Sequence, residues 1–279
     1  MSGKAEQYFY IQQPVAVMRE FPSYGAQVVS QAFFSEQVEI LDQEGEWTLL
    51  LTLIDHYSGW VHRPLLAERT KSFPQKNRKI ATVNRLAAHL YSHQDTIYGP
   101  ILSLPFESQL EVIEEAQAPL YRWIKVCLPN DEEYFIQSGD VILDKPLLSC
   151  HEMCQFSHRF LGIPYTWGGR SSFGFDCSGY VQMLYRQMGI YLPRDSKDQI
   201  KCLQLQSVEM NDLQQGDLLF FGTNLDKVFH VGLYLSEQQF IHTVAAVENS
   251  PYVRYSSLTD PIWNGSATRG CVGARRLIK

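Results

Sequence analysis

The chain has 279 residues, of which 45% are hydrophobic and 19% are charged, and its net charge is -6. This length exceeds the usual size of one domain and supplies enough apolar residues for two or three packed cores. The basic side chains are scattered rather than gathered into a stripe, so neither nucleic acid nor an anionic membrane is an expected partner. The 6 cysteines are sparse for a chain of this length, and we expect free thiols.

The amino-terminal segment gives no sign of export. It lacks the basic start, the apolar run and the small-residue cleavage site of a secretory signal. No other stretch stays apolar over the thickness of a bilayer. We therefore expect a soluble, cytoplasmic protein, and no obligate protein partner is evident.

Residues 10 to 145 alternate short apolar runs with Gly, Pro, Asn and Asp, which is typical of an all-β fold. A weak internal repeat lies within this part. The first copy contains Gln37–Leu41, Trp47 and Gly59–Val61, and the second contains Gln109–Ile113, Trp123 and Tyr134–Ile136. The offset of roughly seventy residues matches one small barrel. We expect the polar segment Glu68–Lys79 to be a solvated linker between the copies.

A helical pattern begins after Pro146. Apolar residues recur near a 3.6-residue period from Leu147 to Leu161, until Gly162 and Pro164 end the pattern. A second helix is predicted from Cys177 to about Met188, and four apolar strands follow it: Asp217–Phe221, Val228–Leu235, Phe240–Val244 and Cys271–Leu277. We therefore expect three domains, at residues 1–70, 71–146 and 147–279.

Cys177 follows a glycine-rich turn and begins the second predicted helix. The unpaired N–H groups and positive potential of a helix N-terminus lower the pKa of a thiol, and they can bind an oxyanion. We therefore expect Cys177 to have a lowered pKa and to act as a nucleophile. The alternative is a structural cysteine that only packs.

Two histidines lie on predicted neighbouring strands, His230 within Phe229–Tyr234 and His242 within Phe240–Val244. Adjacent antiparallel strands can place the two imidazoles side by side. His242 would then orient His230, which would act as general base for the cysteine. The alternative for either residue is a core histidine with satisfied hydrogen bonds.

Six segments in this order and spacing resemble the NlpC/P60 cysteine peptidases: Tyr165–Gly169, Asp176–Gly179, Leu192–Ser196, Gln215–Leu218, His230–Tyr234 and Phe240–His242. The resemblance covers about residues 147–279 and implies an α+β, papain-like catalytic domain. It implies Cys177 as nucleophile, His230 as base and His242 as the orienting residue. It also implies that Tyr165 lies near the oxyanion, by its hydroxyl or by packing.

The amino-terminal part resembles bacterial SH3-like modules, through Val28–Glu36 and Asp55–Val61. The second copy is a weaker match because it lacks a Gly-Trp pair. Two small all-β SH3-like barrels before an NlpC/P60 domain look like the γ-D-glutamyl-L-diamino acid endopeptidases. This resemblance implies a cytosolic enzyme that cleaves the γ-D-Glu-to-diamino acid bond of murein peptides during cell-wall peptide recycling.

In those enzymes acidic residues hold a free N-terminal L-alanine. The resemblance therefore implies a substrate pocket built by Asp176, Ser178, Trp167 and Ser196, with Glu36 and Tyr57 from the first module. All of these except Trp167 have a simpler alternative. Asp176, Ser178 and Ser196 could be residues of helix starts, Tyr57 an ordinary barrel aromatic and Glu36 a solvent-facing turn residue.

Cys150, Cys154 and His158 form one helical stripe, but the stripe is too long for all three to reach one metal ion, and no fourth ligand is evident. We expect no metal and no cofactor. Three other functions stay open: a secreted hydrolase of intact peptidoglycan that uses SH3-like wall-binding modules, a non-catalytic binding protein, and a lipid acyltransferase. The last would place its histidine before its cysteine, whereas Cys177 precedes His230.

Overall fold

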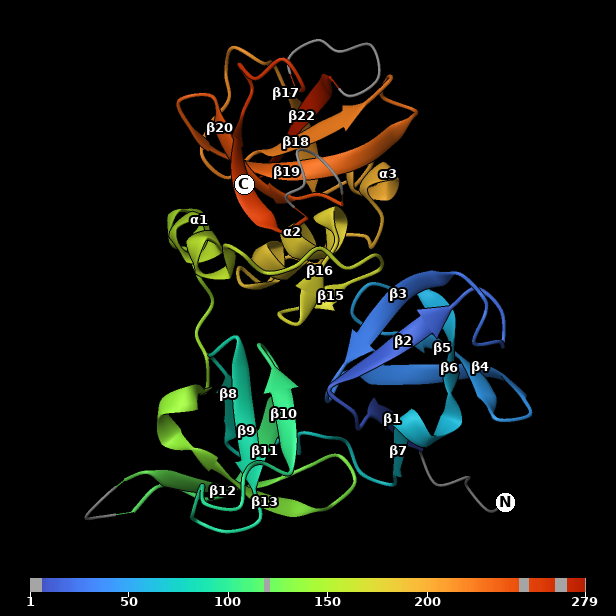
Figure 1. Cartoon of the computed structure of the whole chain (residues 1–279), viewed down its shortest axis with the longest axis vertical. Helices are drawn as coiled ribbons and strands as arrows, with labels where there is room; N and C mark the ends of the chain where they lie inside the picture. The colour runs from blue at the N-terminus through green and yellow to red at the C-terminus, as the bar shows by residue number, and fades with distance from the viewer. Residues whose placement is uncertain (1–6, 118–120, 246–250, 264–269, 279) are drawn as a thin grey trace. The chain divides into compact units, whose positions relative to one another are not determined.

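The computed structural model describes residues 7–117, 121–245, 251–263 and 270–278. It divides into two compact units, shown in Figure 1. The first unit contains Met1–Pro146 and Ser171–Phe173, and the second contains Leu147–Arg170 and Gly174–Lys279. A further division of the first unit near residue 70 stays a prediction.

The first unit is built from antiparallel strands that form two seven-stranded sheets. One sheet has the strand order β3-β2-β6-β5-β4-β1-β7. Its strands are β1 (Tyr8–Ile11), β2 (Val15–Arg19), β3 (Val28–Phe33), β4 (Gln37–Glu44), β5 (Trp47–Thr52), β6 (Ser58–His62) and β7 (Leu66–Arg69). A 3-10 turn, η1 (Arg63–Leu65), joins β6 to β7. Alternate residues of β5 are buried, as expected for strands with one face toward a core.

The second sheet repeats the first in its topology. Its order, β10-β9-β13-β12-β11-β8-β14, is the order of the first sheet with every strand number raised by seven. Its strands are β8 (Ile80–Val83), β9 (Ala87–Tyr91), β10 (Leu102–Pro105), β11 (Gln109–Glu114), β12 (Trp123–Cys127), β13 (Glu133–Gln137) and β14 (Val141–Leu143), with η2 (Ser138–Asp140) before β14. The weak sequence repeat therefore corresponds to a repeated strand order.

The connection between the two sheets is more buried than its polar composition suggests. Arg69 is 7% exposed and its guanidinium pairs with Asp131 at 2.8 Å, and Phe73 is 4% exposed. The Phe73 N–H donates to the Tyr10 hydroxyl at 2.8 Å. The expectation of a solvated linker was wrong at these residues, because a buried arginine that pairs with a carboxylate and an aromatic ring fix the segment on both sheets.

The second unit begins with α1 (Cys150–Ser157) and the 3-10 turn η3 (His158–Phe160). Ser149 and Glu152 form a capping box that fixes the start of α1. Leu147 and Leu148, which fit the apolar period, therefore lie before the helix rather than in it. A short hairpin, β15 (Arg170–Ser171) and β16 (Gly174–Phe175), precedes α2 (Cys177–Arg186), and α3 (Ser196–Gln199) follows α2.

A six-stranded sheet completes this unit, in the order β17-β22-β18-β19-β20-β21. The strands are β17 (Leu205–Val208), β18 (Leu218–Gly222), β19 (Val228–Ser236), β20 (Gln239–Thr243), β21 (Val253–Ser257) and β22 (Cys271–Leu277). Helices α2 and α3 pack against β19, and α1 packs against α2 (Figure 1). Sequence periodicity missed β17 and β21. No helix within the described ranges is long and apolar enough to span a membrane.

Candidate active site

Cys177 is the first residue of α2, and the glycine turn before it packs tightly on the first turn of that helix. The Asp176 N–H donates to the Gly169 carbonyl at 3.0 Å. A Cβ added at Gly179 would lie only 2.2 Å from that same carbonyl oxygen. Gly168 adopts φ 75°, a conformation that glycine tolerates best. These glycines allow the close approach that holds Cys177 at the helix start.

The pKa of the Cys177 thiol is raised to about 12, and burial is the main cause, followed by the neighbouring Asp176 carboxylate. The backbone N–H groups of Val231 and Ser178 and the charge of Arg194 act in the opposite direction. The expectation of a lowered pKa was therefore wrong, because desolvation and a like charge outweigh the helix terminus. The resting sulfur is a neutral thiol at physiological pH, and it needs a partner to remove its proton.

The two histidines lie side by side on the antiparallel strands β19 and β20. His230 Nε2 is 2.7 Å from His242 Nδ1, and His242 Nε2 is 3.0 Å from the Ser256 hydroxyl on β21. His230 is 4% exposed and His242 is fully buried. Burial first, then His230 and Arg254, hold the pKa of His242 well below its usual value, so this ring stays neutral.

Aromatic rings enclose the imidazole pair. Trp263 stacks on His230 with ring centroids 5.3 Å apart and meets His242 edge-on at 5.0 Å. Phe221 lies 5.5 Å from the His230 ring, and Phe240 lies 4.7 Å from the His242 ring. Trp263 itself is only 2% exposed. These rings exclude water from the hydrogen bond between the histidines.

A pocket of ≈ 320 Å³ opens over this arrangement, and its lining is Tyr165, Cys177, Phe229, His230, Val244, Ala245 and Trp263. Cys177 and His230 therefore face one common cavity. Burial and the nearby Cys177 raise the pKa of Tyr165, so its hydroxyl remains protonated and can donate a hydrogen bond. The remaining walls are mostly apolar. A thiol, an imidazole and a hydroxyl donor thus meet where an acyl group could enter.

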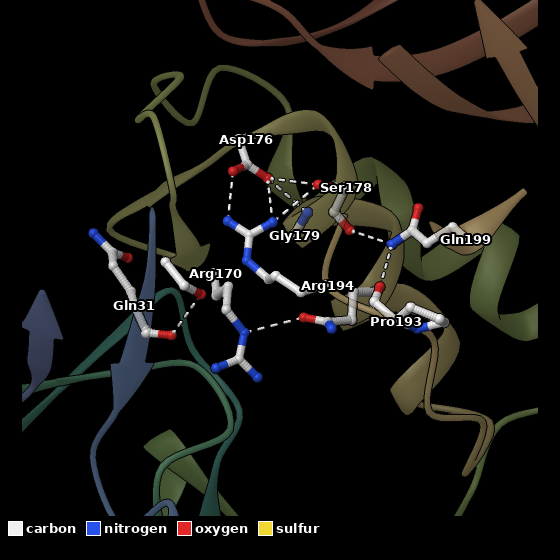
Figure 2. A network of polar contacts seen from close by, with 10 residues as sticks. Gln31, Arg170, Asp176, Ser178, Gly179, Pro193, Arg194 and Gln199 are labelled. Atoms are coloured by element: carbon white, nitrogen blue, oxygen red, sulfur yellow. Dashed lines mark hydrogen bonds and ion pairs between the residues drawn. The ribbon is translucent and has the colours of Figure 1, made fainter. Parts of the chain in front are cut away.

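A network of hydrogen bonds and an ion pair surrounds Asp176 and Ser178, the sequence neighbours of Cys177 (Figure 2). Arg194 holds the Asp176 carboxylate with two nitrogens, at 3.0 and 2.5 Å, and donates to the Ser178 hydroxyl at 2.9 Å. Asp176 also accepts from the Gly179 N–H at 2.7 Å and so caps α2. Gln199 donates to the Ser178 and Pro193 carbonyls. Asp176 therefore acts as a helix cap within a charge-balanced pair.

Comparison with known proteins fits this geometry. The family model described as NlpC/P60 matches residues 162–271, and the model described as the bacterial SH3 domain matches residues 14–67. A γ-D-glutamyl-L-lysine dipeptidyl-peptidase of Bacillus subtilis is 30% identical over 225 residues, which cover 77% of this chain and 72% of the relative. The chain belongs to the NlpC/P60 family. The resemblance of its six motifs is thereby confirmed.

Two further relatives agree with this assignment. A probable endopeptidase of Haemophilus influenzae is 32% identical over 151 residues, which cover 53% of this chain and 89% of that protein. The crystal structure of an NlpC/P60 family protein from Bacillus cereus matches with a TM-score of 0.82 at 23% identity, covering 98% of this chain and 100% of that one. The fold is thus an NlpC/P60 domain after a β-rich part that contains a bacterial SH3 domain.

Not all predicted site residues of the NlpC/P60 domain lie at the pocket lining. Trp167 is 61% exposed on the glycine turn, whereas Ser178 and Ser196 are 5% and 8% exposed at the starts of α2 and α3. Glu36 and Tyr57 belong to the first unit. The Glu36 side chain is 6% exposed and accepts from the Phe33 N–H at 3.1 Å, so it is not the solvent-facing turn residue of the alternative.

The stripe of Cys150, Cys154 and His158 runs from α1 into η3, and its two thiols interact with each other rather than with His158. Cys150 donates to the Gln215 carbonyl, and His158 hydrogen-bonds with the Tyr255 hydroxyl at 2.5 Å. Within the described part of the chain, no group of three or more His, Cys, Asp or Glu side chains is placed to hold a metal ion.

Sequence reasoning missed three residues of this NlpC/P60 site, namely Trp263, Ser256 and Arg194. Arg194 lies inside the segment Leu192–Ser196, and its positive charge could have suggested a partner for Asp176. Ser256 and Trp263 come from a strand and a turn that no apolar pattern marks. Only the paired register of β20 and β21 brings Ser256 to His242.

Proposed function

We propose that this NlpC/P60 chain is a cysteine peptidase that cleaves the amide bond between the γ-carboxyl of D-glutamate and a diamino acid in murein peptides. The observation that carries the proposal is the common pocket of Cys177 and His230, with His242 hydrogen-bonded behind the base. The relatives' names, which include γ-D-glutamyl-L-lysine dipeptidyl-peptidase, support the choice of substrate class.

In the proposed reaction His230 takes the proton of the Cys177 thiol while the sulfur attacks the γ-carbonyl carbon. Because burial raises the pKa of the thiol, the attack depends on His230 to remove the proton. His230 then delivers that proton to the amine of the departing diamino acid. Water, activated by the same imidazole, hydrolyses the resulting thioester and regenerates the thiol.

The oxyanion is proposed to lie between the first-turn amides of α2 and the Tyr165 hydroxyl. Backbone N–H groups at a helix start point toward developing negative charge without reorganisation. The raised pKa of Tyr165 supports its role as a donor, since the hydroxyl keeps its proton throughout. Removal of one such donor typically slows acyl transfer by about 10²- to 10³-fold.

We further propose a preference for peptides with a free N-terminal L-alanine. The candidates to bind that end are Asp176, Ser178, Trp167 and Ser196, together with Glu36 and Tyr57 of the first unit. The charge of Asp176 is already balanced by Arg194. Its attraction for a substrate ammonium is therefore weaker than that of an unpaired carboxylate.

The amino-terminal unit is proposed to contain two SH3-like barrels, at residues 1–70 and 71–146, before a papain-like catalytic domain at 147–279. The shared strand order of the two sheets supports this assignment for the second module, which the SH3 family model does not cover. A cytosolic role in peptide recycling stays a prediction of the sequence.

The test compares release of the diamino acid from L-Ala-γ-D-Glu-diaminopimelate and from its N-acetylated form. We expect the native chain to cut the free-amine peptide and Cys177→Ala to cut neither. Equal cleavage of both peptides would remove the proposed preference and favour a hydrolase of intact wall peptides. Cleavage of neither peptide by the native chain would overturn the proposed substrate class.

A further inference from the structure

We propose that Ser256 is a positioning residue, whose hydroxyl oxygen fixes the protons of the two histidines in the tautomers that catalysis requires. This inference rests on the proposed function, since it assumes that His230 exchanges a proton with the thiol. It adds Ser256 to the hydrogen-bonded pair of His230 and His242, which lies behind the pocket that Cys177 and His230 share.

The register of two strands brings Ser256 to this place. β20 pairs with β21 so that Phe240 lies opposite Ser256 and His242 lies opposite Arg254. Residues that lie opposite each other, or two apart on one strand, share a face of the sheet. The side chains of His242, Arg254 and Ser256 therefore lie on one face. Ser256 is 9% exposed, and its Oγ is 3.0 Å from His242 Nε2.

The positions of the protons determine which group donates in each of these hydrogen bonds. When His230 has taken the thiol proton, both of its nitrogens carry hydrogen, and Nε2–H points at His242 Nδ1 over 2.7 Å. Nδ1 can accept only without a proton of its own. Since His242 is neutral, its single hydrogen must then lie on Nε2, directed at the Ser256 oxygen.

The opposite arrangement is unproductive. If the Ser256 hydroxyl donated to His242 Nε2, the hydrogen of His242 would lie on Nδ1 and point at His230 Nε2. A neutral His230 that accepts there carries its own hydrogen on Nδ1, the nitrogen left for the thiol. Such a ring cannot remove the Cys177 proton. The direction of the Ser256 hydrogen bond therefore decides whether the base is available.

The hydrogen bond between His242 and Ser256 is enclosed by aromatic rings, so its loss is harder to replace than the loss of a hydrogen bond at the surface. Trp263 meets the His242 ring edge-on and Phe240 packs against it, so water has little access to replace a lost partner. His230 and Arg254 are the charged or titratable groups that act on His242, and both disfavour a positive charge on it. The ring thus relies on a neutral oxygen, such as that of Ser256, to accept from Nε2–H.

The direct test is the ¹⁵N spectrum of the full chain labelled at histidine, with His242 assigned by the signal lost in His242→Gln. The two nitrogens of a neutral imidazole differ in chemical shift according to which one carries the hydrogen. We expect the native His242 to show the Nε2–H tautomer and Ser256→Ala to shift it partly or fully to Nδ1–H. A native Nδ1–H tautomer, or an unchanged tautomer in Ser256→Ala, overturns the proposal.

Kinetics supply the second readout. Ser256→Ala should lower kcat roughly 10- to 100-fold while KM stays within about twofold, because the hydroxyl acts on the base and not on bound substrate. Ser256→Thr keeps the hydroxyl and should recover most of kcat. Ser257→Ala is the matched control, since its hydroxyl pairs with Thr259. Equal kcat in Ser256→Ala and Ser257→Ala would contradict the positioning role.

The two proposals fail in different ways. If the native chain does not cleave the murein peptide, the proposed function is wrong, and the tautomer of His242 still decides the role of Ser256. If the peptide is cleaved but Ser256→Ala leaves both the tautomer and kcat unchanged, only the role of Ser256 is wrong.

Discussion

Cys177 adjoins two buried polar regions that are built in opposite ways. In one region, His230 and His242 share a hydrogen bond inside a shell of aromatic rings, and His242 is neutral because burial lowers its pKa. In the other region, Arg194 holds the Asp176 carboxylate as an ion pair through a two-nitrogen contact. The first region is the imidazole side and the second is the ion-pair side.

The difference separates two tasks. On the imidazole side, His230 can take and return a proton while the neutral His242 orients it. The ion-pair side instead fixes geometry, since Asp176 caps α2 and Arg194 also holds Ser178. We therefore expect the imidazole side to control the rate and the ion-pair side to control the stability of the site.

The largest effect should follow from loss of the base. We expect His230→Ala to lower kcat/KM by at least about 10³-fold, because the thiol then has no group to take its proton. Its matched control is His158→Ala, which removes a histidine of the same domain that hydrogen-bonds with Tyr255 outside the pocket. Hydrolysis of the murein peptide measures both. If His230→Ala kept more than a tenth of the native rate, the imidazole side would not control catalysis.

A large effect on stability is expected from Arg194→Met. This change leaves Asp176 charged in a site where it is 8% exposed, and breaking such a buried pair costs about 3–5 kcal/mol. The double variant Asp176→Ser with Arg194→Met removes both charges and keeps a residue that can cap α2, so it should recover much of that loss. Urea unfolding of the native chain and the variants measures the coupling. Additive losses would show that the pair is not coupled.

The imidazole side also shows how far sequence can reach. Cys177, His230 and His242 lie in short local motifs, each on an element that an apolar period or alternation predicts. The pocket that Cys177 and His230 share, with His242 hydrogen-bonded behind His230, needs only neighbouring strands and a helix packed against them. The repeated strand order of the amino-terminal unit was likewise visible as a weak sequence repeat, because each module repeats its own hydrophobic spacing.

What sequence could not supply depends on contacts between distant or irregular segments. Ser256 approaches His242 through strand register, and Trp263 approaches it from a turn after β21. The expectation of a lowered pKa for Cys177 was wrong for a related reason. A helix terminus is a local feature, but burial by the whole domain and the charge of Asp176 outweigh it.

The pH dependence of stability gives a smaller but specific effect of the imidazole side. The pKa of His242 lies well below its usual value of 6.5 only in the folded state. As the pH falls below 6.5, the unfolded chain therefore binds a proton that the folded chain does not, and stability is lost at up to about 1.4 kcal/mol per pH unit. His242→Gln can keep both neighbouring hydrogen bonds and should remove this part of the slope. Urea unfolding at several pH values between 5 and about 7.5 measures it, and equal slopes would contradict the assignment.

The smallest effect is expected from Lys197→Met, which tests whether burial or mere pairing gives the ion-pair side its strength. Lys197 pairs with Asp195 at 3.4 Å, but its side chain is 62% exposed, whereas that of Arg194 is 1% exposed. Water and salt screen an exposed pair, so the free energy of unfolding should change by less than about 0.5 kcal/mol. Urea unfolding of Lys197→Met and Arg194→Met under the same conditions compares the two losses directly. Equal losses of unfolding free energy in the two variants would mean that pairing near α3 stabilises the fold irrespective of burial. The difference between the imidazole side and the ion-pair side would then not depend on desolvation.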